Sequence, residues 1–198
     1  MKDKIIIKSR ELFLKVGFKS ITMDDIATEM SISKKTIYKY FSNKEDLIEQ
    51  TTAAAHKEVH QIINSIIALN HNAIQENFEI RNMFQEMFKS SDDSPVFQLK
   101  KHYPEIYERV IKREIEECNI WFKQNIGKGI TEGLYRKGIN AESYTYFYYT
   151  LVFNIKEATS SEKEAQKLEL EMLEYHIRAM ATPKGITELE KYIKPNNA

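Results

Sequence analysis

The side chains best suited to chemistry in this sequence lie in one short basic stretch, from Ser31 to Leu47. It contains four lysines and three aromatic residues among several hydroxyl side chains, and no acidic residue occurs from Met30 to Lys44. Ammonium and hydroxyl groups donate hydrogen bonds to phosphate oxygens, and lysine can also donate to guanine in the major groove of DNA. The stretch therefore predicts a local polyanion site, in a chain whose 29 basic and 29 acidic residues otherwise balance.

Residues that end and begin helices indicate which elements position these lysines. Gly17 suits the position that ends a first helix, because glycine adopts the left-handed conformation required there. Thr22 and Asp25 have the spacing of a capping box, which predicts a short second helix over about residues 23–30.

The lysines themselves fall on the next predicted helix. Ser33 has the position of its N-cap, and Ile37 faces inward while the lysines stay outside. Two short helices joined by a tight turn form a helix-turn-helix. Ser42 and Glu45 have the spacing of another capping box, which predicts a longer helix after the motif.

The segment from Gly17 to Leu47 resembles the DNA-binding domain of TetR-type transcriptional regulators. Ser31 departs from the family pattern, which commonly has glycine in that turn. The residues that carry the resemblance are Gly17, Phe18, Thr22, Ile26, Ala27, Ser33, Thr36, Ile37, Tyr38, Tyr40, Phe41, Asn43, Lys44, Glu45 and Leu47.

The resemblance implies contacts with double-stranded DNA. Lys39 is the leading candidate to read a base, and Lys44 should contact phosphate because backbone amides at a helix start favour an anion. The alternative interpretation is a solvated lysine-rich face, which is what most charge clusters are. The predicted DNA contacts are Thr22, Lys34, Lys35, Thr36, Tyr38, Lys39, Tyr40 and Lys44.

The rest of the chain also has the pattern of a helical protein. Glycine and proline are few, with six and four in 198 residues, and apolar residues recur mainly at intervals of three and four. The predicted fold class is all-α: an N-terminal three-helix helix-turn-helix DNA-binding domain, residues 1–47, plus a larger C-terminal helical domain, residues 48–198. The resemblance implies that this second domain binds a ligand and dimerises.

A small-molecule pocket is expected in the second domain, by resemblance to the family. Aromatic and methionine side chains are plentiful between residues 72 and 149, and they suit a largely apolar effector with one or two polar groups. Side chains of these types at helical spacing also occur in an ordinary core. The candidate pocket residues are Phe84, Met87, Phe88, Tyr103, Tyr107, Asn119, Trp121 and Tyr148.

Two helices near the carboxyl terminus, about residues 141–159 and 162–180, carry apolar residues on two faces each. A helix that is apolar on two faces packs on both, and two such helices suit a dimeric four-helix bundle. The resembling family pairs these helices with those of a second subunit. The predicted homodimer interface residues are Tyr149, Phe153, Leu170, Leu173 and Ile177.

Signals for catalysis, cofactors and metal are weak. His56 and His60 lie four residues apart, which permits chelation, but the sequence shows no third ligand with a compelling spacing, so a solvated histidine pair and no metal are expected. The chain has no phosphate loop or nucleophile motif, and no cofactor or enzymatic activity is predicted. A single cysteine and the absence of a long apolar segment predict a cytoplasmic protein with no membrane partner.

The function predicted from these features is a TetR-type transcriptional regulator, acting as a repressor. It would bind a palindromic operator as a homodimer and be released by a small effector. Two alternatives remain open: an architectural DNA-binding protein without an effector, and a helical enzyme with an accessory DNA-binding module. The first alternative would show little sequence preference and no ligand-dependent release.

Overall fold

The computed structural model describes residues 1–89, 91 and 93–193, and the all-α prediction is confirmed. A three-helix amino-terminal motif precedes a larger helical domain. Along the described residues the helices are α1 (Lys2–Val16), α2 (Met23–Glu29), α3 (Lys34–Tyr38), α4 (Lys44–Ala68), α5 (Ala73–Phe88), α6 (Pro95–His102), α7 (Pro104–Thr131), α8 (Ala141–Ala158), α9 (Glu162–Met180) and α10 (Pro183–Ile193).

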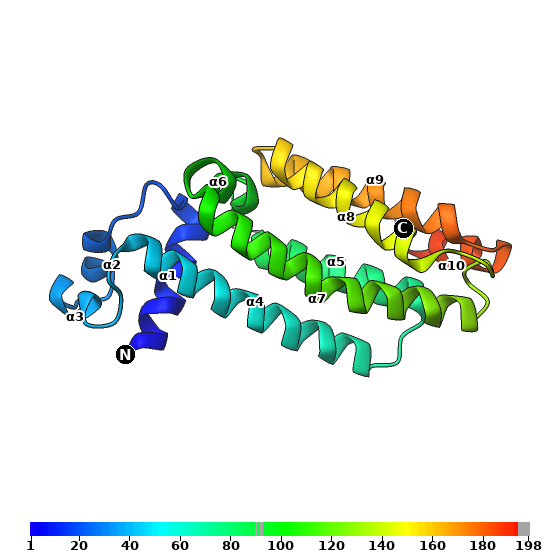
Figure 1. Cartoon of the computed structure of the whole chain (residues 1–198), viewed down its shortest axis with the longest axis horizontal. Coiled ribbons are helices and arrows are strands. Elements are labelled where there is room, and N and C mark those ends of the chain that lie inside the picture. Colours follow the sequence, from blue (N-terminus) through cyan, green and yellow to red (C-terminus); the bar gives the residue numbers. More distant parts are fainter. Residues whose placement is uncertain (90, 92, 194–198) are drawn as a thin grey trace, which may run out of the picture.

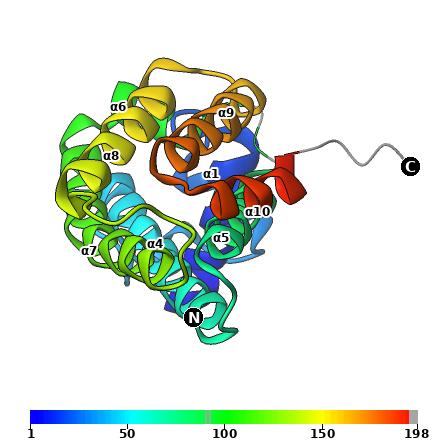
Figure 2. The same ribbon diagram turned by 90° about the vertical axis from the view of Figure 1, so that its right-hand side faces the viewer.

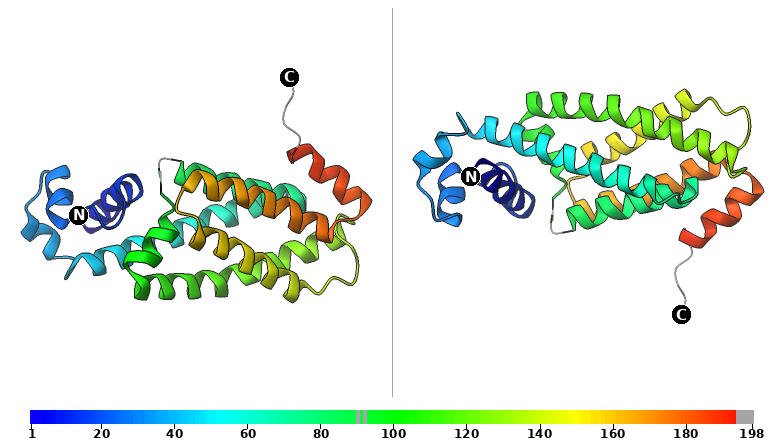
Figure 3. Two further views of the ribbon diagram at one scale, coloured as in Figure 1. Left: turned by 90° about the horizontal axis from the view of Figure 1, so that it is seen from above. Right: turned by 90° about the horizontal axis from the view of Figure 1, so that it is seen from below.

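The molecule is elongated, with the amino-terminal motif at one end and α10 at the other (Figure 1). Helix α4 leads out of the motif and continues along α7 through the larger domain. Figure 3 gives the same arrangement from above and below, with α1–α3 projecting beyond the bundle. Viewed along its length, the bundle of α4–α9 surrounds a central region, with α8 and α9 on one side of it (Figure 2). None of the helices in the described part of the chain has the length and hydropathy of a membrane span.

The helix caps explain why the motif folds as it does. The Thr22 hydroxyl accepts a hydrogen bond from the Asp25 amide, and the Asp25 carboxylate accepts one from the Thr22 amide, so the predicted capping box is confirmed. Ser33 caps α3 as predicted. The prediction for α4 is wrong by one residue, because Asn43 rather than Ser42 is the N-cap.

The reason for this shift is the choice of hydrogen-bond partner. The Asn43 side chain accepts from the Asp46 amide at 2.7 Å, while the Ser42 amide donates to the Asp46 carboxylate at 2.8 Å. Asp46 thus takes the place that the sequence assigned to Glu45.

A shared core fixes the helix-turn-helix against its neighbours. Ile26, Ile37 and Phe41 are almost fully buried and pack with Leu47 at the start of α4. This cluster continues to Leu99 of α6, so the motif and the larger domain share apolar contacts. Burying each of these side chains contributes about 1.5–3 kcal/mol. This buried cluster therefore fixes the position of α3 and of its exposed face.

Polar contacts also join α6 to the end of α1. The Phe18 amide donates to the Gln98 side chain at 3.0 Å, and the Tyr103 hydroxyl donates to the Phe18 carbonyl at 3.4 Å. Gly17 has φ = 96°, a conformation that favours glycine, and a Cβ there would lie 2.5 Å from the Gln98 side-chain oxygen and displace that side chain. These contacts join the larger domain to the motif at Phe18.

The turn between α2 and α3 carries local strain. Ser31, which replaces the glycine common in the family, has φ = 53°, in the left-handed region that favours glycine. We expect Ser31→Gly to stabilise the protein by about 1 kcal/mol, because a side chain in this conformation costs roughly that amount. A thermal unfolding curve should show Tm rising by roughly 2–4 °C for a chain of this size.

The matched control for this prediction is Ser20→Gly. Ser20 is exposed and lies in the preceding turn, but its φ is not positive. Glycine there only increases the entropy of the unfolded chain and should leave Tm unchanged or lower it. Equal changes in Tm for the two variants would contradict the proposed strain at Ser31.

Candidate nucleic-acid interface and internal cavity

The outer face of α3 presents basic and hydroxyl side chains to solvent. Lys35, Tyr38 and Lys39 are exposed, while Ile37 between them is buried. Tyr40, just after α3, is 41% exposed. Ammonium and hydroxyl groups of this kind can donate hydrogen bonds to base edges and to phosphate oxygens.

Other predicted DNA contacts already make hydrogen bonds within the motif. The Lys34 ammonium lies 2.7 Å from the Asp24 carboxylate, and this hydrogen bond raises the pKa of Lys34. The Thr36 hydroxyl lies 2.8 Å from the Ser33 hydroxyl, and the Thr22 hydroxyl takes part in the capping box. These three side chains lie at the same end of the molecule. To contact DNA, they would have to exchange these hydrogen bonds or make further ones beside them.

Lys44 lies at the start of α4 and is only partly exposed. Its ammonium donates to the Lys19 carbonyl at 3.0 Å and lies 5.8 Å from the centre of the Tyr103 ring. Partial burial lowers the pKa of Lys44. The side chain therefore links α4 to the α1–α2 turn and to the larger domain, and a phosphate would have to share this ammonium.

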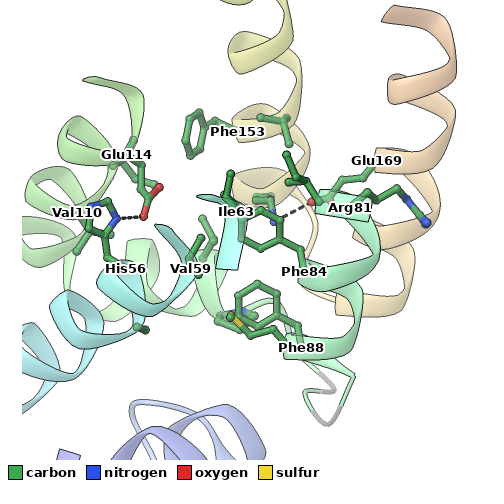
Figure 4. Close-up of a pocket in the computed structure, with 18 of the residues that line it drawn as sticks. His56, Val59, Ile63, Arg81, Phe84, Phe88, Val110, Glu114, Phe153 and Glu169 are labelled. Atoms are coloured by element: carbon green, nitrogen blue, oxygen red, sulfur yellow. Dashed lines mark hydrogen bonds and ion pairs between the residues drawn. The ribbon is translucent and has the colours of Figure 1, made fainter. Parts of the chain in front are cut away.

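A cavity of about 270 Å³ lies among the helices of the larger domain and extends to Phe13 of α1 and to Phe18. Its wall is mainly apolar and includes Val59 and Ile63 of α4, Phe84 and Phe88 of α5, and Phe153 of α8 (Figure 4). The volume is close to the lower end of the roughly 300–1,000 Å³ typical of small-ligand pockets. The cavity is thus suited to a small, largely apolar molecule.

Five of the eight predicted pocket residues line this cavity: Phe84, Met87, Phe88, Trp121 and Tyr148. The other three lie outside its wall. Tyr103 contacts the helix-turn-helix motif, and the Tyr107 hydroxyl hydrogen-bonds to Glu157. Asn119 is partly buried on α7 but does not border the cavity.

Charged groups that the sequence analysis did not select also border the cavity. Lys156 lies 2.9 Å from Glu169, and its ammonium lies 5.6 Å from the ring centres of Phe84 and Phe88. Arg81 donates to a backbone carbonyl of α9 at 3.3 Å. The charges come from three helices, and their spacing in the sequence carried no signal that they meet.

A buried polar network closes one end of the cavity. The Asn125 amide donates to Glu76 at 2.8 Å, and the Asn77 amide donates to Asn125 at 2.8 Å. The Lys128 ammonium compensates the Glu76 charge at 2.7 Å. Three of these side chains, Glu76, Asn77 and Asn125, line the cavity and offer polar partners to an otherwise apolar ligand.

The predicted dimer-interface residues face the subunit's own interior. Tyr149, Leu173 and Ile177 are buried in the chain, Leu170 packs partly buried against the core, and Phe153 lines the cavity. Periodicity correctly gives α8 and α9 two apolar faces each, but it does not tell which face the bundle covers. Tyr149, Leu173 and Ile177 are therefore covered within the subunit, whereas Phe153 and Leu170 remain partly exposed.

The opposite face of α8 and α9 exposes large apolar side chains. We name this surface the α8/α9 patch, and its members are Tyr146, Phe147, Leu151 and Tyr175. Phe147 is 52% exposed and Tyr175 is 67% exposed. Several exposed apolar residues on two adjacent helices are typical of a protein–protein contact surface.

Comparison with known proteins agrees with this architecture. Residues 5–51 match the family model described as bacterial regulatory proteins, tetR family. The biofilm operon icaADBC HTH-type negative transcriptional regulator IcaR of Staphylococcus aureus is 32% identical over 107 residues, which cover 54% of this chain and 52% of that protein. The chain thus spans about half the length of the curated relative that it matches.

Solved structures extend the likeness to nearly the whole chain. A transcriptional regulator from Cytophaga hutchinsonii has a TM-score of 0.75 at 16% identity, with 91% of this chain and 98% of that one covered. A TetR-family regulator from Agrobacterium tumefaciens has a TM-score of 0.72 at 14% identity, with coverage of 91% and 97%. At these identities the likeness shows the fold alone.

Fold and motif together define a helix-turn-helix protein with an all-helical second domain. The matching family model, the curated relatives and the shared fold identify the class further. The chain belongs to the TetR family of bacterial regulatory proteins.

Proposed function

We propose that this protein is a transcriptional repressor that binds a palindromic operator as a homodimer. The observation that carries the proposal is the exposed Lys35, Tyr38 and Lys39 face of α3, on a motif that matches the family model. Base edges in the major groove can be read by such side chains, whereas phosphate contacts fix the register. The described relative is a negative regulator, which supports the repressing sign. Because the proposed target is DNA, we also propose that the protein acts in the cytoplasm.

The homodimer follows from the α8/α9 patch and from the reach of one motif. A single α3 contacts one half-site, and half-sites lie about 34–36 Å apart, so two subunits are needed for a palindrome. A second copy of the chain is the occupant we propose for the patch. This assignment keeps the predicted helices as the dimer elements but uses their opposite faces.

Selection of bound sequences from a random pool of duplex DNA tests the function directly. We expect a two-fold palindrome to be recovered by the full-length protein. Recovery of no common sequence would favour the architectural alternative, because phosphate contacts alone carry no sequence preference. Half-sites without two-fold symmetry would contradict the dimer while preserving the DNA-binding role.

We propose further that the internal cavity binds the effector, a small and largely apolar molecule with one or two polar groups. The apolar body would contact Phe84, Phe88 and Ile63, and polar groups would meet Asn77 or Asn125. By linkage, an effector that binds better to the DNA-incompetent conformation weakens DNA binding by the same factor. The α6 contacts with Phe18 give such a shift a physical route to the motif.

Filling the cavity should separate effector response from DNA binding. We expect Val59→Phe to retain operator binding but to lose release by any compound that releases the wild type, because Val59 lines the cavity from α4 and is not part of the exposed α3 face. A screen of apolar and amphipathic molecules would record the rise in Tm and the release of operator DNA together. Wild-type hits should lose both effects in the variant.

The control adds the same side chain outside the cavity. Ile120→Phe places a phenyl ring on α7 at an exposed position and should leave the response intact. If hits act equally on Val59→Phe and the wild type, the effector binds elsewhere. If no compound produces both effects in the wild type, the proposal of an effector cavity is contradicted.

A further inference from the structure

Three potential metal ligands meet where α4 packs against α7. His56 and His60 lie on one face of α4, since residues four apart are neighbours on a helix. Glu114 of α7 reaches them, and one ligand atom from each of the three side chains lies within 4.8 Å of the others. The labelled side chains of His56 and Glu114 point toward one another beside the cavity (Figure 4).

These donor types and their spacing fit a transition-metal cation. Two imidazoles and a carboxylate are a common protein ligand set for zinc, with a fourth position left to water or another ligand. Tetrahedral ligands at zinc distances are about 3.3 Å apart, so small side-chain rotations from the observed spacing would complete the site. All three side chains are partly buried, which shields them from competing solvent.

The surroundings hold the histidines in place. The His56 and His60 ring centres are 4.0 Å apart, and the His60 ring lies 4.3 Å from the Trp121 ring. His56 Nδ1 is hydrogen-bonded to the Glu114 carboxylate. A ring that is already oriented loses little freedom when it binds a metal.

We propose that His56, His60 and Glu114 form a binding site for a divalent transition-metal cation of the zinc type. Because histidine binds a metal as neutral imidazole and glutamate as carboxylate, the cation would take the place of the hydrogen bond between His56 and Glu114. His56 and Glu114 also line the cavity, so the open coordination position faces the space assigned to the effector. The metal site itself does not depend on that assignment or on DNA binding.

A bound cation would cross-link α4 and α7, which are also joined by packing and by the ion pair between Arg109 and Glu49. Helix α4 begins inside the helix-turn-helix motif and α7 belongs only to the larger domain. A cation held by both fixes their spacing at the site, which stabilises the folded state by mass action. The direct consequence is a metal-dependent rise in thermal stability.

The experiment uses the metal-free full-length protein with Zn²⁺ alone as the probe. We expect one Zn²⁺ per chain by calorimetric titration and a rise in Tm. Glu114→Gln and His60→Gln should each weaken binding by more than the roughly 10- to 100-fold typical of losing a supporting partner, because each removes a direct ligand. His71→Gln removes a histidine outside the cluster and should bind Zn²⁺ like the wild type.

Co²⁺ gives a second measurement that needs no variant. Four-coordinate Co²⁺ bound by nitrogen and oxygen ligands absorbs visible light much more strongly than octahedral aqueous Co²⁺, so saturation of the wild type should produce this intense absorption. Absence of Zn²⁺ binding would overturn the site. Wild-type affinity in both Glu114→Gln and His60→Gln, or an equal loss in His71→Gln, would overturn it as well.

Discussion

Phe147→Glu should convert the protein to a monomer and lower its affinity for a palindromic operator by about 1,000-fold or more. The carboxylate would be placed in the α8/α9 patch, where pairing with a second copy would bury its charge. Loss of one half-site removes most of the difference between specific and non-specific binding, which spans about 10³–10⁷-fold. Light scattering would give the mass, and titration of labelled operator would give the affinity.

Two further variants show whether the effect belongs to the patch. Ile120→Glu adds the same charge at a residue that is 58% exposed on α7, and it should remain dimeric. Leu173→Glu should instead unfold the subunit, because Leu173 is 2% exposed in its core. A monomeric wild type that binds a palindrome tightly, or a dimeric Phe147→Glu, would contradict the proposed interface.

Lys39→Ala should relax the sequence preference at one position in each half-site. Lys39 is exposed on α3, and loss of a base contact costs about 1–3 kcal/mol, or roughly 5- to 150-fold in affinity. Lys44→Ala should lower affinity for all sequences alike and reduce the salt slope by about one. Binding measured for a set of single-base operator variants at several salt concentrations separates the two effects.

The position of Lys44 makes the salt slope the informative quantity. If Lys44 only joins the Lys19 carbonyl to α4, its removal weakens binding through a displaced motif, and the slope stays unchanged. A reduced slope with an unchanged Tm identifies a phosphate contact. Equal loss of sequence preference in Lys39→Ala and Lys44→Ala would contradict the assignment of base and phosphate roles.

The sequence by itself determined the helix-turn-helix and the all-helical class. The N-cap hydrogen bonds of α2 and α3 join residues three apart, Thr22 with Asp25 and Ser33 with Thr36. The burial of Ile37 follows from helical spacing, so a short stretch of sequence is enough to predict these features. Where two caps competed, at Ser42 and Asn43, the pattern missed by one residue. When two neighbouring side chains can both cap a helix, the sequence pattern places the helix start only to within about one residue.

Only the tertiary structure decided which side chains meet across the bundle. His56 and Glu114 lie 58 residues apart, and their meeting depends on the packing of α4 on α7. The packing of α8 on α7 and of α9 on α8 and α5 likewise determines the inner faces of these two helices, with Leu173 buried and Phe147 exposed. Periodicity records that a helix has apolar faces, but the neighbour that covers each face is set by the fold as a whole, because burial is a property of the packed molecule.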